Sequence, residues 1–117
     1  MKYMILVYGS QRDYDAPDAR EMSAIGEFLG KFTAELAESG ELVDTQGLTA
    51  PVQARRVQGS DDAQVVTDGP FAETEEVLAG YWIVECAGIE RATEIAARLN
   101  RCPGPQPASG TIIRPIA

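Results

Sequence analysis

The first apolar stretch of the chain covers residues 2–8 and is apolar on both faces of an extended backbone. Its sequence, KYMILVY, is short and rich in β-favouring residues, and Gly9 and Ser10 follow it, so it predicts a strand over Lys2–Tyr8. One face of this strand would carry Tyr3, Ile5 and Val7, and the other Met4, Leu6 and Tyr8. A strand with two apolar faces is covered on both sides, so the pattern indicates two covering layers.

Between Pro17 and Gly40, apolar residues recur at steps of three and four, which predicts an amphipathic helix of about six turns. Pro17 suits the first turn, and Asp18 and Glu21 lie favourably for the helix dipole. Gly40 is expected to end the helix as a left-handed cap, and Gln11–Ala16 is expected to form a polar loop before it. The apolar positions are Met22, Ile25, Phe28, Leu29, Phe32 and Leu36.

The rest of the chain alternates short β-like runs with one further helical pattern. The helical pattern covers Gly88–Leu99, and the following Arg101–Gln106, with its prolines and glycine, predicts an irregular loop. The polar turn 59–62 predicts a hairpin between the second and third of the remaining strands. Those strands are expected over Glu41–Leu48, Ala54–Gln58, Gln64–Asp68, Leu78–Cys86 and Thr111–Ile116.

This order of elements predicts an α+β fold, a ferredoxin-like split β-α-β with an inserted β-hairpin, in a single domain of residues 1–117. Both helices would cover one face of an antiparallel sheet and leave the other face open. A second copy that lays its sheet against this open face would cover it, so we expect a homodimer. The alternative is that Tyr3, Ile5 and Val7 lie beneath a loop.

Composition narrows the classes of partner. The chain has 117 residues, 10 basic and 18 acidic side chains and a net charge of −8, which argues against binding to a nucleic-acid backbone. No apolar run is long enough to span a bilayer, and the N-terminal run is too short for a signal peptide, so we expect a cytoplasmic protein without a membrane partner. The two cysteines, Cys86 and Cys102, do not make a disulfide framework, and Cys86 is expected in the core.

The segment Asp68–Glu76, DGPFAETEE, contains both turn residues and a run of polar residues. Aspartate favours turn entry, Gly69 supplies unusual backbone angles, and Pro70 fixes φ, with Phe71 as an apolar anchor. These features have a purely structural explanation. Turn chemistry does not explain Glu73, Thr74 and Glu76.

DGPFAETEE, with the opening MKYMILVYG and the closing SGTIIRPI, resembles the signature of the YCII-related, DGPF-domain family. The family usually has DGPFAETKE, which this chain matches except for Glu75 in place of lysine. The resemblance covers essentially the whole chain and implies a dimeric α+β barrel without an established reaction. It also allows a functional link to a sigma factor, by family resemblance only.

Histidine is absent from the chain. Catalysis by Ser-His-Asp or Cys-His and metal sites with histidine ligands are therefore excluded, and we expect no metal and no cofactor. Some relatives are thought to use a His–Asp pair, which this chain cannot form. Ser109-Gly110 stands where the family often has His-Gly before its last strand.

The remaining candidates lie on strands and loops near the expected open face. Trp82 should pack on the helices, which turns Tyr81 and Glu85 toward the open side. Arg114 could pair there with Glu85 or Asp68, or hold an anionic ligand. The candidate catalytic residues are Asp68, Tyr81 and Glu85, and the candidate ligand-binding residues are Arg12, Phe71, Glu73, Thr74, Ser109 and Arg114.

Three functions remain open. The first is a small-molecule-binding or regulatory homodimer, in which the DGPF loop lines a cleft beside the sheet and Asp68 and Glu73 serve as acids or acceptors. The second is a cofactor-free enzyme that uses carboxylates such as Glu85 for proton-transfer or lactone chemistry. The third is a structural dimer without a ligand, in which the DGPF loop only shapes the chain.

Overall fold

The computed structural model describes all residues from Met1 to Ala117. No helix in it is both long enough and apolar enough to cross a membrane. The elements in chain order are β1 (Lys2–Gly9), α1 (Gln11–Asp15), α2 (Ala19–Glu38), β2 (Leu42–Gly47), the 3-10 turn η1 (Pro51–Gln53), β3 (Arg55–Gln58), β4 (Val65–Asp68), β5 (Val77–Glu85), α3 (Ile89–Leu99) and β6 (Thr111–Pro115).

The main sheet has four strands in the order β2-β5-β1-β6, and all neighbouring strands are antiparallel. With β3 and β4 set aside, this is the strand order of a split β-α-β, so the predicted α+β class is confirmed and the topology is compatible with a ferredoxin-like fold. Strands β3 and β4 pair only with each other, from Arg55 opposite Asp68 to Gln58 opposite Val65. They form the predicted hairpin.

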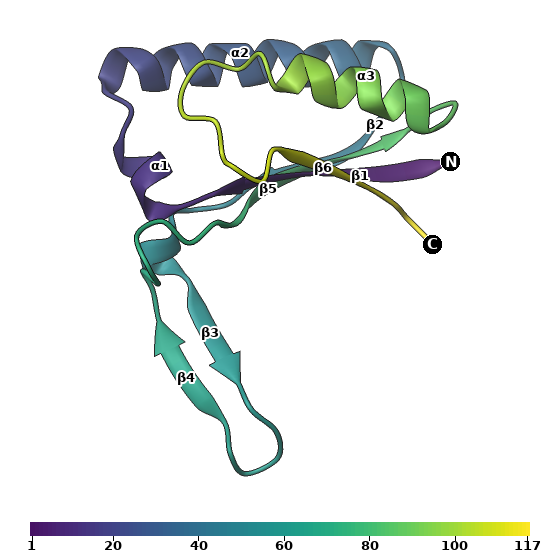
Figure 1. Ribbon diagram of the computed structural model, residues 1–117. Coiled ribbons are helices and arrows are strands. Elements are labelled where there is room, and N and C mark those ends of the chain that lie inside the picture. The colour runs from purple at the N-terminus through teal and green to yellow at the C-terminus, as the bar shows by residue number, and fades with distance from the viewer.

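Helices α2 and α3 lie together on one face of the sheet, and the other face carries no helix (Figure 1). Helix α2 begins after Asp18, whose carboxylate accepts a hydrogen bond of 2.8 Å from the backbone N–H of Glu21. Gly40 follows the helix with φ of +79°, which confirms the predicted left-handed cap. Pro17 precedes the N-cap and lies outside the first turn, so its predicted place in the helix is wrong.

The core fills the space between the sheet and the C-terminal half of α2. Ile5 and Val84 of the sheet are fully buried against Leu36 of α2 and Ile95 of α3. The ring of Trp82 meets Phe32 edge to face with 5.4 Å between centroids, and Cys86 packs against this cluster. The expectation that the Trp82 face of β5 packs on the helices is therefore confirmed.

The face of β1 that carries Tyr3, Ile5 and Val7 is the helix-covered face. Tyr3 lies opposite Val84 and Ile5 opposite Trp82 across the antiparallel pair, and Tyr3 and Ile5 are buried with them. The alternative that these side chains lie beneath a loop is wrong, because their cross-strand partners place them in the core. The open face of β1 therefore carries Met4 and Leu6.

Residues 11–15, expected within a polar loop, form the short helix α1. The hydroxyl of Ser10 accepts a hydrogen bond of 3.2 Å from the N–H of Asp13, and the Asp13 carboxylate accepts one of 3.0 Å from the N–H of Ser10. This reciprocal capping box replaces the missing helical partners at the helix start. The Ser10–Asp13 spacing was the sequence signal for it.

The β3–β4 hairpin forms an arm that projects from the body on the open side of the sheet (Figure 1). None of its strand residues is buried. Val57, Val65 and Val66 are each more than half exposed on it.

Candidate functional site

A cavity of about 660 Å³ lies between the N-terminal half of α2 and the sheet. Strands β1, β2 and β5 form its floor, α2 its roof, α1 one wall and the segment 99–107 another. Its volume is within the range of small-molecule pockets. The cavity is on the helix-covered face of the sheet, opposite the open face.

Small residues explain why this space is not filled. Gly30 of α2 and Gly47 of β2 both border the cavity, and a Cβ atom at either position would meet no atom within 4 Å. Met22, the first apolar residue of the helical stripe, is 53% exposed, whereas Leu36 at the other end of the stripe is 1% exposed. The apolar face of α2 is therefore packed at one end and lines a hollow at the other.

Hydroxyl groups supply part of the polar lining. Thr45 donates a hydrogen bond of 2.8 Å to the carbonyl of Tyr81, and Thr111 donates one of 2.6 Å to the amide oxygen of Asn100. The Thr33 oxygen instead accepts the indole N–H of Trp82 at 3.1 Å. Each hydroxyl keeps unused hydrogen-bonding capacity that a bound molecule can use.

Two ionisable groups with raised pKa values border the cavity. Burial raises the pKa of the Tyr14 phenol, which donates a hydrogen bond of 3.0 Å to the carbonyl of Leu48. Burial also raises the pKa of the Cys102 thiol. Both groups are consequently neutral near pH 7 and act as polar, uncharged parts of the wall.

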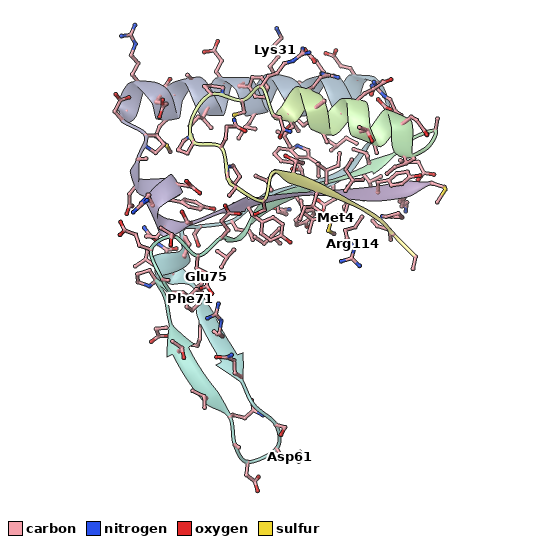
Figure 2. The ribbon with its side chains drawn as sticks, viewed as in Figure 1. Met4, Lys31, Asp61, Phe71, Glu75 and Arg114 are labelled. Atoms are coloured by element: carbon pink, nitrogen blue, oxygen red, sulfur yellow. The ribbon has the colours of Figure 1, made fainter.

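The DGPF segment begins at the base of the arm. Asp68 forms an exposed ion pair of 2.7 Å with Arg55, its partner across the hairpin. The guanidinium of Arg56 lies 4.0 Å from the ring centroid of Phe71 and 3.0 Å from the Glu75 carboxylate. Glu75, at the position where the related signature has lysine, thus holds a cation of the arm (Figure 2).

Gly69 fits here because of a close backbone approach. A Cβ atom at this position would lie 1.8 Å from the carbonyl oxygen of Pro51, so any other residue would collide with η1. The φ angle of Gly69 is not positive, and the Gly69–Pro70 peptide bond is cis. The amide of Gly69 also donates a hydrogen bond of 2.8 Å to Ala54.

The far end of the DGPF segment holds two walls of the cavity. The carbonyl of Glu73 accepts a hydrogen bond of 3.1 Å from the N–H of Arg12 in α1. The Glu76 carboxylate accepts hydrogen bonds from the N–H groups of Ala108 at 2.7 Å and Ser109 at 3.0 Å, and from the Ser109 hydroxyl. Glu76 therefore fixes the segment that follows α3.

The candidates on the open face have separate partners. Tyr81 donates a hydrogen bond of 2.9 Å to Asp44, and this bond raises the pKa of the Tyr81 phenol. Glu85 lies 3.6 Å from the N-terminal ammonium group. Arg114 stands beside Met4, its neighbour across the strands, and points away from the helices (Figure 2). The expected pairing of Arg114 with Glu85 or Asp68 is wrong, because both carboxylates pair with other cations.

None of the candidate residues named from the sequence lines the cavity. Glu73 and Ser109 take part in contacts that hold its walls, whereas Asp68 and Phe71 contact arginines of the arm. Tyr81, Glu85 and Arg114 do not join them in one cluster. Thr74 and the Arg12 side chain are exposed. The polar lining residues were not expected from the sequence; they include Asp13, Tyr14, Thr33, Thr45 and Asn100. Only the capping-box spacing of Ser10 and Asp13 gave a signal for part of this set.

Comparison with known proteins gives two results. The family model of the YCII-related domain matches residues 1–114. An uncharacterised protein of Rhizobium meliloti (strain 1021) is 29% identical over 118 residues, which cover 100% of this chain and 93% of that protein.

Proposed function

The chain belongs to the YCII-related domain family, and from this premise we propose that it is a homodimeric module that binds a small molecule in the cavity beneath α2. The observation that carries the proposal is the unpacked half of the α2 stripe. Apolar side chains such as Met22 and Ile25 border a space of about 660 Å³ there. Empty apolar volume costs stability, and a ligand that fills it recovers that free energy.

The polar lining suits the orientation of a ligand. Thr45, Thr111 and Tyr14 donate their protons to the wall, so their oxygens are left to accept from a bound molecule. A few fixed polar groups in a largely apolar pocket are typical of small-molecule sites. In this proposal the DGPF residues Asp68, Phe71, Glu73 and Thr74, together with Ser109, contribute by shaping the walls and the arm.

A second copy on the open face of the sheet completes the proposed module. Met4 lies opposite Ile83, and Leu6 opposite Ile112, so apolar side chains continue across three strands on the side without helices. The arm projects on this same side, and a two-stranded hairpin is only marginally stable by itself in water (Figure 1). A dimeric α+β barrel would bury this face, and the arm would extend along the partner.

Binding is tested with Nile red, an uncharged apolar dye, because Trp82 is the only tryptophan and borders the cavity. We expect saturable quenching of Trp82 by energy transfer to the dye. Gly30→Leu should weaken this binding by about tenfold or more, because Gly30 lines the cavity and a side chain there meets no other atom. The matched control is Gly26→Leu, one turn earlier on α2 and outside the cavity lining. Equal binding by both variants, or no saturable binding by the wild type, would overturn the binding proposal.

Dimerisation is tested by sedimentation equilibrium. We expect a dimer for the wild type and a monomer for Leu6→Asp, because the open face then carries a charge at its centre. Ile89→Asp, an exposed position at the start of α3, is the matched control and should remain dimeric. A monomeric wild type at high micromolar concentration contradicts the homodimer.

A further inference from the structure

We infer that the cavity takes uncharged or cationic molecules and rejects carboxylates and phosphates; this inference rests on the proposed function. Asp13 is the one charged residue in the cavity lining, and neither lysine nor arginine contributes to it. The charge that a ligand meets inside is therefore negative. The net charge of −8 on the chain adds a field of the same sign around the entrance.

Asp13 has an acceptor available for a ligand. One carboxylate oxygen, Oδ2, accepts the N–H of Ser10 in the capping box, and Oδ1 has no hydrogen bond in the structure. The residue is half-buried in α1, and the capping box holds its orientation. A group that carries N–H or O–H donors can donate a hydrogen bond to the free Oδ1 oxygen, whereas an anion is repelled by the carboxylate.

The basic residues near the cavity lie outside its wall. Lys31 follows Gly30 on α2 but points away from the sheet (Figure 2). Arg98 of α3 binds Glu35 of α2, and Arg91 binds Glu41 near the end of α2. Arg12 precedes Asp13 on α1 and is exposed. An anion inside the cavity thus loses its hydration without gaining a cation as partner, which disfavours its entry.

Three of the lining hydroxyl groups act in the same direction, whereas the Thr33 hydroxyl, which accepts the indole N–H of Trp82, keeps its own proton. The protons of Tyr14, Thr45 and Thr111 are donated to the protein, so these positions offer oxygen acceptors to a ligand. Three such acceptors and the free oxygen of Asp13 match a ligand that carries donors. An alcohol, an amide or a protonated amine on an apolar body has this chemistry.

The test uses three probes with the same apolar chain: 1-decanol, decylammonium and decanoate, each titrated at neutral pH against the Nile red complex. We expect the alcohol and the ammonium to displace the dye and decanoate to bind at least about tenfold more weakly. Asp13→Asn should lower the affinity for decylammonium and leave that for decanol nearly unchanged. Asp15→Asn, on the same helix but outside the lining, is the matched control.

The outcomes separate this inference from the proposed function. Decanoate that binds as tightly as decanol overturns the charge preference while the cavity remains a binding site. An unchanged affinity of Asp13→Asn for decylammonium overturns the role of Asp13 in that preference. If Nile red and all three probes fail to bind, the proposed function fails and the inference falls with it.

Discussion

The two halves of α2 carry the same apolar spacing and meet the sheet in different ways. In the C-terminal half, Phe32 and Leu36 are buried against the sheet and α3. In the N-terminal half, Met22 and Ile25 border the cavity instead. The comparison shows that helical periodicity identifies the face directed to the sheet, and that it does not determine whether this face is packed or lines a hollow.

The difference comes from what stands beside α2 along its length. Next to the packed half, α3 contributes four buried residues, Ala92, Ile95, Ala96 and Leu99. After Leu99 the helix ends, and the chain continues as a proline-containing segment that only borders the cavity. Proline cannot continue a helix, so α3 ends where the cavity begins.

The largest expected loss of stability comes from a substitution in the packed, C-terminal half of α2. Leu36→Ala should lower the free energy of unfolding by about 2–5 kcal/mol, because Leu36 is fully enclosed and its removal leaves a cavity. Met22→Ala should cost less than about 1 kcal/mol, because Met22 is half exposed and already borders empty space. Urea unfolding followed by circular dichroism measures both. Similar losses for the two variants would contradict the contrast between the halves.

The next effect concerns an ion pair near the end of the packed half. Arg91 of α3 donates two hydrogen bonds of 2.8 Å to the Glu41 carboxylate, and mainly these bonds lower the pKa of Glu41 from 4.5 to about 2. Because the folded-state pKa is the lower one, the stabilisation is complete above pH 4.5 and is lost as the pH falls toward 2. Solvent screening limits this stabilisation to about 1–2 kcal/mol.

Glu41→Gln tests this dependence. The variant should lose stability at neutral pH and show a flatter stability profile between pH 4.5 and 2 than the wild type. The control is Glu27→Gln, at an exposed position of α2 without a hydrogen-bond partner, and it should keep the wild-type profile. An unchanged profile for Glu41→Gln would show that the pair does not stabilise the packed end.

A smaller effect is expected at the wall of the hollow half. Glu76→Ala removes the acceptor of the Ala108 and Ser109 amides, which should cost about 1 kcal/mol. Amide hydrogen exchange at these two residues should become faster, while exchange in the core strands stays slow. Glu73→Ala is the control in the same segment, because Glu73 contributes only its backbone carbonyl. Equal exchange in both variants would refute the anchoring role of Glu76.

The smallest loss of stability is expected at α1, which forms another wall of the cavity. Tyr14→Phe removes the hydrogen bond to the Leu48 carbonyl and should cost about 0.5–1 kcal/mol, measured by urea unfolding. Tyr8→Phe is the control, since Tyr8 also borders the cavity and its hydroxyl makes no hydrogen bond. If Tyr8→Phe destabilises as much as Tyr14→Phe, the contact with Leu48 does not hold α1 in place.

Much of the fold could be predicted from the chain. The spacing along α2, the β-rich runs at β1 and β5, and the Gly40 cap are local signals, and the structure confirms each. The helix-facing side of Trp82 also followed from strand alternation. The short helix α1 was missed, although the Ser10–Asp13 spacing marks its start.

The candidate site could be predicted only in part. The DGPF segment was recognised as unusual, but its partners, Arg55, Arg56 and Ser109, come from other parts of the chain. The polar residues of the cavity wall lie on separate elements, and no spacing between them marks them as a set. Such a set forms only when the elements meet.

The sequence by itself determined most of the elements, their order and the apolar face of α2 and α3, because these depend on residues close together along the chain. The tertiary structure decided which face of β1 is covered, where α3 stops relative to α2, and that a cavity remains between them. These outcomes depend on the volumes of side chains that meet from distant segments. A glycine such as Gly30 leaves open space or permits close packing according to what stands opposite, and only the folded chain sets what stands there.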